Sequence, residues 1–385
     1  IHAESAGSTV RREDNLIVVA RSYVAETALT LSQLALARTQ VALNPAVVAG
    51  MPVGGCYHRV RHIATRSCLH RATCLIVSLR SSRPTVEWLE IHDRSNGIML
   101  TMADLQSFVE QALCRKVRAM VPLGGGDVAD SYRVVLDDGS TVFAKTKVDA
   151  VPEFFVTEAT GLTWLREAGQ VAVPEVIAVA DDPAFLVQEW IEPGFPTLDT
   201  ESELGRNLAR LHLAGAPSFG REDRRSTGSR GLPNEPCETW AEFYTTQRLL
   251  PLAKLARDGN ALPDRTVADI EDVAMRLEHL GGPPEPPARL HGDLWAGNRL
   301  VGAGGVSWLI DPAAHGGHRE FDLAMMRLFG GYGEECFAAY EEVAPLADGW
   351  VERIALHQLA PLIVHSIKFG GPYVPATQRA LSTVL

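Results

Sequence analysis

The segment at 291–298, HGDLWAGN, constrains this chain more than any other stretch. A short hairpin is predicted directly after it, at 299–310, around a glycine-rich turn. The segment and the hairpin together carry Asp293, an asparagine five residues later at Asn298, and Asp311 at the end of the second strand. A lone His-Gly-Asp or Asp-Pro is usually an ordinary turn. The three side chains in this order are therefore more informative than any one of them.

These three residues suit the transfer of a phosphoryl group. An aspartate followed by an asparagine five residues later repeats the spacing of a kinase catalytic loop. Asp293 would accept the proton of an attacking hydroxyl. Asn298 and Asp311 offer the hard oxygen ligands that Mg²⁺ prefers when it bridges nucleotide phosphates. The competing interpretation is a pair of unrelated turns.

A second group of signals lies upstream, between residues 102 and 191. Asp138-Gly139 predicts a two-residue hairpin between strands. The triplet Gly124-Gly125-Gly126 follows a predicted strand and departs from G-x-G-x-x-G, so it is weak evidence for a phosphate loop by itself. The predicted helices are 103–114 and 152–168, and the predicted strands are 117–123, 131–136, 141–146, 176–180 and 185–190.

Lys145 is the residue of this upstream region that calls for a function. It is one of five lysines in a chain with 31 arginines, and it lies inside an apolar strand. It is either a snorkelling lysine with a buried stem or a phosphate-binding lysine held by Glu158 of the following helix. The order of glycine loop, hairpin, lysine and helix glutamate favours the second interpretation. In a kinase-like fold the backbone from Glu189 to Ile191 would meet the adenine.

The chain resembles the fructosamine kinase (ketosamine-3-kinase) family in the blocks LHGDLWAGNRLV, WLIDPAAHGGHREFDLAMMRLFGGY, YEEVAPLADGW and HQLAPLIVHSIKFGGPY. That family belongs to the protein-kinase-like and aminoglycoside-phosphotransferase-like enzymes, and the resemblance covers residues 102–385. It implies an α+β, two-lobed protein-kinase-like fold, with a small antiparallel-sheet N-lobe at 102–191 and a larger, mainly helical C-lobe at 192–385.

The resemblance also implies an activity. Members of the family phosphorylate the 3-hydroxyl of ketosamines with ATP and Mg²⁺, and the unstable product releases the amine. Carried over to this chain, Asp293 is the general base, Asn298 and Asp311 are the metal ligands, and Lys145 with Glu158 binds phosphate. Gly124, Gly125 and Gly126 then cover the nucleotide. The alternatives are an aminoglycoside, choline or sugar kinase of the same fold, or a nucleotide-binding pseudokinase. The presence of Lys145, Asp293, Asn298 and Asp311 disfavours the pseudokinase.

Residues 1–100 differ sharply from the rest. They hold eleven Arg, no Lys and seven acidic residues, against 25 basic and 40 acidic residues in 101–385. We predict an N-terminal extension here, disordered or not native to the enzyme, with Met99 or Met102 as the native start. An Arg-rich transit peptide is the alternative. The spacing of the six scattered potential ligands does not predict a zinc site: Cys56, His58, His62, Cys68, His70 and Cys74.

Composition bounds the partners. The net charge of −11 argues against a dedicated nucleic-acid binder, and the longest apolar runs are too short to span a membrane. Six irregularly spaced cysteines favour a reducing, cytoplasmic setting. The predicted partner is a small-molecule ketosamine or glycated amine, and the oligomeric state stays open.

Four local expectations concern the C-lobe. Thr200 with Glu203 predicts a capping box at the start of a helix. The charged stretch 221–227 either lines the acceptor site or is a variable surface loop. Asp322 is expected to cap a helix at 323–328 and to bond the catalytic loop. His318 and Arg319 either face the hydroxyls of the substrate or neutralise nearby acids.

Overall fold

The structure is a computed structural model that describes residues 102–124, 129–222, 226–227 and 231–385, together with the backbone of five strands before residue 98. The chain divides into two compact units, 1–98 and 99–385. In the first unit β1 (Ser8–Glu13) pairs with β2 (Leu16–Arg21), and β4 (Arg71–Ser78) pairs with both β3 (His58–Ile63) and β5 (Thr85–His92). The predictions for 1–100 rest on side chains outside the described residues and stay predictions.

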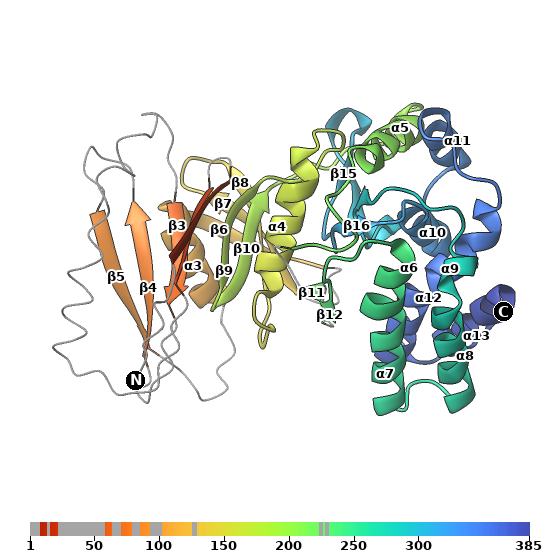
Figure 1. Cartoon of the computed structure of the whole chain (residues 1–385). Coiled ribbons are helices and arrows are strands. Elements are labelled where there is room, and N and C mark those ends of the chain that lie inside the picture. Colours follow the sequence, from red (N-terminus) through yellow and green to blue (C-terminus); the bar gives the residue numbers. More distant parts are fainter. Residues whose placement is uncertain are drawn as a thin grey trace, which may run out of the picture. The chain divides into compact units, whose positions relative to one another are not determined.

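The second unit opens with the small sheet predicted for the N-lobe (Figure 1). After α3 (Met102–Leu113), five antiparallel strands are arranged in the order β6-β7-β8-β10-β9. Their bounds are β6 (Val117–Leu123), β7 (Asp130–Leu136), β8 (Thr141–Thr146), β9 (Val176–Asp181) and β10 (Ala184–Glu189). The predicted Asp-Gly hairpin is confirmed: Gly139 has a φ of 86°, and the Asp138 carboxylate accepts the amide of Ser140 at 3.0 Å.

The helix α4 (Phe154–Glu167) connects β8 to β9 and packs on β9 and β10. Its apolar residues are spaced by three and four positions, and the buried ones include Phe155, Leu162 and Leu165. In the sheet, Leu186 of β10 lies directly opposite Lys145 of β8. Cross-strand partners point to the same face, and both side chains are buried, so the lysine and the helix meet on one side of the sheet.

The rest of the unit is the mainly helical lobe that the sequence predicts. Its elements are α5 (Thr200–Leu213), β11 (Ser226–Thr227), β12 (Leu232–Pro233), α6 (Trp240–Phe243), the π-helical turn η1 (Tyr244–Leu249), α7 (Leu250–Asp258), α8 (Asp264–Met275), α9 (Leu277–Leu280), β13 (Ala288–Leu290), η2 (Ala296–Asn298), β14 (Arg299–Val301), η3 (Ala303–Gly305), β15 (Ser307–Leu309), β16 (His315–Gly317), α10 (Glu320–Phe329), α11 (Glu334–Val343), α12 (Trp350–Phe369) and α13 (Tyr373–Val384).

Two apolar cores hold the unit together. One lies among α6 to α9, α12 and α13, which Figure 1 shows as one group of helices. The other joins α4 to α5, α10 and α11, and it also contains Leu294 of the catalytic loop and Leu309 of β15. Because the second core includes both the N-lobe helix and the predicted catalytic segment, it fixes the two relative to each other.

A tyrosine compensates for the proline in the longest helix. Pro361 lies inside α12 and cannot donate to the carbonyl of His357 one turn earlier. The Tyr244 hydroxyl lies 3.1 Å from that carbonyl oxygen and 3.0 Å from the carbonyl oxygen of Leu356, and it accepts the amide of Ala360 at 3.1 Å. Tyr244 reaches it from the π-helical turn η1, which lies between α6 and α7.

The predicted helix after residue 199 is present, but its predicted capping box is wrong. The structure begins α5 at Thr200 after Asp199, and neither side chain makes the predicted capping contact. The Thr200 hydroxyl instead donates to the carbonyl of Gly305 at 2.8 Å. This bond links α5 to the hairpin of β14 and β15, so a tertiary partner replaces the local one.

None of the described helices is both long enough and apolar enough to cross a membrane.

The contact between α5 and α11 predicts an unusual response to a helix substitution. A Cβ at Gly205 would lie 2.0 Å from the carbonyl oxygen of Cys336. Gly→Ala in an open helix stabilises by roughly 1 kcal/mol, but here the overpacking reverses the sign. We expect Gly205→Ala to lower the free energy of unfolding by about 2 kcal/mol or more in urea titration. Glu203→Ala, on the exposed side of α5, is the control, and equal values for the two variants would contradict the packing.

Candidate active site

The predicted catalytic loop follows β13 and is closed by its own hydrogen bonds. The Asn298 amide donates to the backbone carbonyl of Asp293 at 2.9 Å and to its carboxylate at 3.1 Å. The same amide lies 3.4 Å from the carbonyl oxygen of Asp311. The structure therefore brings together the three residues that the sequence singles out. The side-chain oxygen of Asn298 makes no hydrogen bond to a described residue, which leaves it available as a ligand.

The loop depends on a glycine and a neutral histidine. Gly292 has a φ of 80°, and a Cβ there would lie 2.1 Å from the carbonyl oxygen of Ala313. His291 is fully buried, and burial lowers its pKa. Its Nδ1 accepts the amide of Asp293 at 3.3 Å, so its Nε2 carries the proton and donates to the carbonyl of Ile310 at 2.9 Å. The histidine thereby ties the loop to the strand that ends at Asp311.

Asp322 of the following helix holds this loop through its backbone amides. Its carboxylate accepts the amide of His291 at 2.7 Å and the amide of Gly292 at 2.9 Å. His212 of α5 lies 3.3 Å from the same carboxylate. The predicted bond to the catalytic loop is confirmed, but the predicted cap is wrong, because α10 begins at Glu320 and Asp322 lies within its first turn.

Lys145 lies between two carboxylates. Its ammonium group is 2.6 Å from Glu158 and 2.8 Å from Asp311, and its side chain is 5% exposed. The predicted pair with Glu158 is present, and Asp311 is a second partner that the sequence did not indicate. Burial disfavours the charged form, but attraction to the two carboxylates outweighs it and raises the pKa of Lys145. The lysine is therefore a fixed cation at the contact between sheet, helix and catalytic segment.

Asp311, the second partner of Lys145, has an unusual backbone conformation. Its φ of 52° is unusual for a residue with a side chain, and its carboxylate remains 45% exposed although it contacts Lys145. A residue is held in this conformation only when its surroundings determine it. Here those surroundings are the Lys145 contact and the bond from Asn298 to the Asp311 carbonyl.

A stripe of residues on α4 faces the same segment, and the sequence analysis missed most of it. Beyond Glu158, a Cβ at Gly161 would lie 3.3 Å from Ala314 and 3.4 Å from Pro312. One turn later, the ring of Trp164 has the guanidinium groups of Arg221 and Arg289 at 5.2 and 4.6 Å from its centroid. Arg289 lies in β13 and also donates to the Trp164 carbonyl at 2.6 Å. Glu158, Gly161 and Trp164 follow one another at a spacing of three residues, and this spacing could have indicated that they share one face of α4.

The structure describes only part of the segments that are predicted to contact the nucleotide. Gly124 is exposed at the end of β6, while Gly125 and Gly126 lie outside the described residues. Glu189 ends β10, and its carboxylate accepts the amide of Glu175 at 3.1 Å. Ile191 follows it and approaches Gly302 of the β14–β15 hairpin. Gly194 then donates to the Val301 carbonyl at 2.8 Å, so the connection between the lobes is held against that hairpin.

The polar residues after β16 stabilise the fold. Arg319 donates to Glu285 at 2.8 and 2.7 Å, which confirms the interpretation that it neutralises an acid. His318 is buried, with its Nε2 3.8 Å from Glu285. Its Nδ1 accepts the amide of Glu320 at 3.3 Å, so the ring proton lies on Nε2 and leaves no lone pair there for a metal. The buried group of His318, Glu320 and His357 is therefore a poor metal site, although its ligand atoms lie within 4.8 Å of one another.

The charged loop at 221–227 is only partly described. Arg221 is buried, and its amide donates to the carbonyl of Asn234 at 2.9 Å. Residues 223–225 and the side chains of 226 and 227 lie outside the described residues, so the choice between acceptor site and surface loop stays a prediction.

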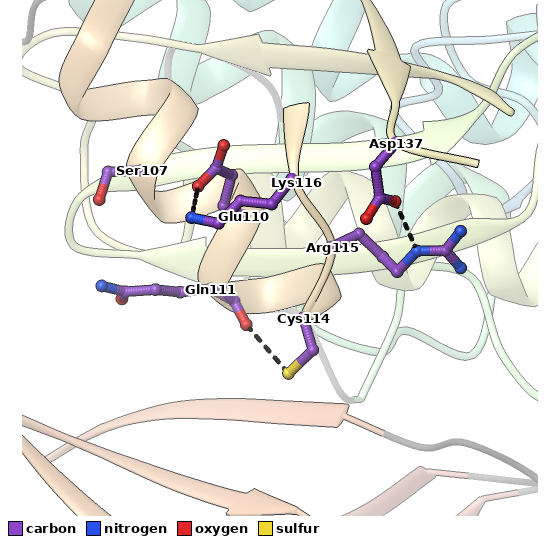
Figure 2. A pocket seen from close by; sticks show the side chains of 7 residues that line it. All are labelled: Ser107, Glu110, Gln111, Cys114, Arg115, Lys116 and Asp137. Carbon is purple, nitrogen blue, oxygen red and sulfur yellow. Dashed lines mark hydrogen bonds and ion pairs between the residues drawn. The ribbon is translucent and has the colours of Figure 1, made fainter. Parts of the chain in front are cut away.

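A surface pocket elsewhere in this unit is separate from these residues. Figure 2 shows its lining by α3, by the segment leading into β6 and by Asp137. Its charged groups already pair with each other, with Lys116 2.5 Å from Glu110 and Arg115 3.0 Å from Asp137. None of the predicted site residues lines it, so it is not part of the candidate active site.

Comparison with known proteins gives a consistent result. A family model described as fructosamine kinase matches residues 101–385. A probable ketoamine kinase from Vibrio parahaemolyticus is 34% identical over 72% of this chain and 94% of its own length. One from Synechocystis is 32% identical over 68% and 89%. The crystal structure of a provisionally named fructosamine-3-kinase from Thermobifida fusca is 42% identical, covers 74% of this chain and 99% of its own, and has a TM-score of 0.69.

The burial of Asp293 predicts how its removal affects stability. Burial raises the pKa of this carboxyl from 3.8 to about 7, against the opposing hydrogen bond from Asn298. A carboxyl whose pKa is higher in the folded state destabilises the protein above that pKa, and the cost disappears as the pH falls toward 4. We expect Asp293→Asn to raise the free energy of unfolding by about 2 kcal/mol at pH 8, with the gain shrinking toward pH 5. Two results would contradict this explanation: a variant no more stable than wild type at pH 8, or a difference in the free energy of unfolding that does not change with pH.

Proposed function

The chain belongs to the fructosamine kinase family, and from that premise we propose that it transfers the γ-phosphoryl group of ATP to the 3-hydroxyl of a ketosamine. Family membership makes it a phosphotransferase that acts on a sugar hydroxyl. The ketosamine, the position phosphorylated, the bound nucleotide and the residue roles below are the proposal. The phosphorylated ketosamine would then decompose and free the amine.

The observation that carries this proposal is the contact of Lys145 with both Glu158 and Asp311. An ammonium group has three N–H donors, and two of them face these carboxylates. The third is left for a phosphate oxygen of the nucleotide. A snorkelling lysine would extend its ammonium group into water, whereas this one is buried at the point where the two lobes meet.

Asn298 and Asp311 fit a magnesium ion. Both offer oxygen atoms, and the Asp311 carboxylate is half exposed beside the catalytic loop. Mg²⁺ usually takes one or two protein carboxylates and completes its shell with phosphate and water. Bound there, the ion would neutralise the charge that develops on the transferred phosphoryl group.

Asp293 is the proposed general base. Its carboxylate is oriented by Asn298, and a pKa raised to about 7 by burial suits a group that must accept a proton near neutral pH. The 3-hydroxyl would give its proton to Asp293 as its oxygen bonds to the γ-phosphorus and the bond to the ADP oxygen breaks. The backbone from Glu189 to Ile191 would meet the adenine, and the cytoplasmic setting expected from cysteine usage would supply the ATP.

The activity is tested by ADP release from MgATP with fructosyl, ribulosyl and erythrulosyl amines as acceptors. We expect release that depends on the acceptor with at least one of them, because the site positions a base, a phosphate-binding cation and oxygen ligands together. Aminoglycoside, choline and free-sugar acceptors form the comparison panel. If the enzyme phosphorylated one of the comparison acceptors and none of the ketosamines, the result would favour another kinase of this fold. Nucleotide binding with no turnover on any acceptor would favour a pseudokinase.

The role of Asp293 has a separate kinetic test. Asp293→Asn should abolish acceptor-dependent turnover and leave MgATP binding nearly unchanged, because the residue acts on the acceptor and not on the nucleotide. Calorimetric titration of nucleotide measures the second quantity. Asp272→Asn, at an exposed helix position, is the control. Loss of nucleotide binding together with turnover would instead assign Asp293 a structural role.

A further inference from the structure

A continuous row of aromatic side chains begins at the catalytic loop and runs away from it. We call the row, made of Trp295, Phe329, His365, Phe369 and Tyr373, the aromatic row. Neighbouring ring centroids are 6.0 Å apart between Trp295 and Phe329, 5.0 Å between Phe329 and His365, and 4.9 Å between His365 and Tyr373. Phe369 completes it at 5.6 Å from His365.

Close backbone contacts hold the row against the catalytic loop. A Cβ at Gly297 would lie 2.3 Å from the Trp295 ring, so this ring lies across the loop itself. A Cβ at Gly331 would lie 2.4 Å from the Cβ of Ala296, which brings the end of α10 beside the loop. At the far end, Gly370 and Gly371 both have positive φ and turn the chain from α12 into α13. That turn places Tyr373 next to Phe369, with 5.9 Å between their ring centroids.

The row is open to solvent in places where a core would be closed. Trp295 is 39% exposed and Phe369 is 50% exposed. The remaining three rings are half-buried. His365 donates through Nδ1 to the Pro361 carbonyl at 2.7 Å, and burial lowers its pKa, so it is a neutral ring in this row. Exposed aromatic faces that lie against the loop carrying Asp293 indicate a ligand surface more than a packing defect.

One cation accompanies the row. Lys368 is exposed, and its ammonium group lies 4.6 Å from the Phe369 ring centroid. It is close enough to Asp293 for its charge to act on that carboxylate. Within the described part of the chain it makes no ion pair. The surface beside the base thus offers flat apolar faces and a positive charge without a carboxylate partner.

We propose that the aromatic row and Lys368 bind the amine part of the acceptor, and that the preferred acceptors are ketosamines of free amino acids with apolar or aromatic side chains. The inference rests on the proposed function. With the sugar 3-hydroxyl at Asp293, the amine part extends from the sugar along the adjoining surface. An apolar side chain stacks on the exposed rings, and the carboxylate of the amino acid pairs with Lys368.

Three acceptors built on one sugar separate the two contributions. The ketosamine of phenylalanine has both a ring and a carboxylate, that of glycine has only the carboxylate, and that of phenethylamine has only the ring. For the wild-type enzyme we expect kcat/KM to be highest for the phenylalanine derivative. The KM for ATP should be the same with all three, because the row lies on the acceptor side.

Two substitutions should then act on different acceptors. Phe369→Ala is expected to lower kcat/KM at least about threefold for the phenylalanine and phenethylamine derivatives and to leave glycine nearly unchanged. Lys368→Met removes a charge that also acts on Asp293 and so affects all three acceptors, but it is expected to lower kcat/KM about two- to fivefold more for the phenylalanine and glycine derivatives than for the phenethylamine derivative. Phe369→Tyr should restore the preference for rings, and Met275→Ala, at a residue 78% exposed on α8, is the control.

Equal effects of each variant on all three acceptors, or no effect on any, would overturn the inference while leaving the kinase activity in place. If the wild-type enzyme turned over none of the ketosamines, the proposed function would be overturned, and this inference with it. The two failures are distinct, because the first shows acceptor-dependent ADP release without discrimination and the second shows none.

Discussion

One buried ammonium group connects the elements that form the candidate active site. Lys145 comes from the sheet, Glu158 from the helix α4 and Asp311 from the end of the β14–β15 hairpin, and all three meet within hydrogen-bond distance. A lysine that is 4% exposed needs compensating charge, and the two neighbouring carboxylates supply it. This electrostatic contact links the proposed nucleotide-binding and catalytic segments, which the second apolar core also holds together.

Packing supports it along one face of α4. Glu158, Gly161 and Trp164 follow one another at a spacing of three residues, and they face Lys145, the segment after Asp311, and the two arginines Arg221 and Arg289. Since Arg289 lies two residues before His291, the same helix is also tied to the start of the catalytic loop. Asp322 of α10 also holds that loop, through the amides of His291 and Gly292. The loop is thus fixed by bonds to its backbone and by the Asn298 amide, which also orients the Asp293 carboxylate.

Much of this could be predicted from sequence because it is encoded locally. The Asp138-Gly139 hairpin, the strand bounds around it and the catalytic loop with its second aspartate follow from turn residues and spacing. Thr200 is a residue for which the local sequence pattern is not enough. Its hydroxyl could cap the helix, but it donates to the carbonyl of Gly305, more than a hundred residues away. The Lys145–Asp311 contact and the repair of the Pro361 gap by Tyr244 are likewise long-range. Spacing cannot reveal such contacts, because they exist only once distant elements have packed.

In the proposed function the Lys145 ammonium binds nucleotide phosphate and is not merely part of a structural ion pair. The most direct measurement compares Lys145→Met with Lys147→Met, a lysine just beyond the same strand. Acceptor-dependent ADP release and nucleotide affinity are measured on samples shown to be folded by circular dichroism. The account predicts that Lys145→Met lowers kcat/KM for ATP at least about a hundredfold, as loss of one preorganised charge does, while Lys147→Met stays near wild type. A folded Lys145→Met enzyme with kcat/KM for ATP within about twofold of wild type would contradict it.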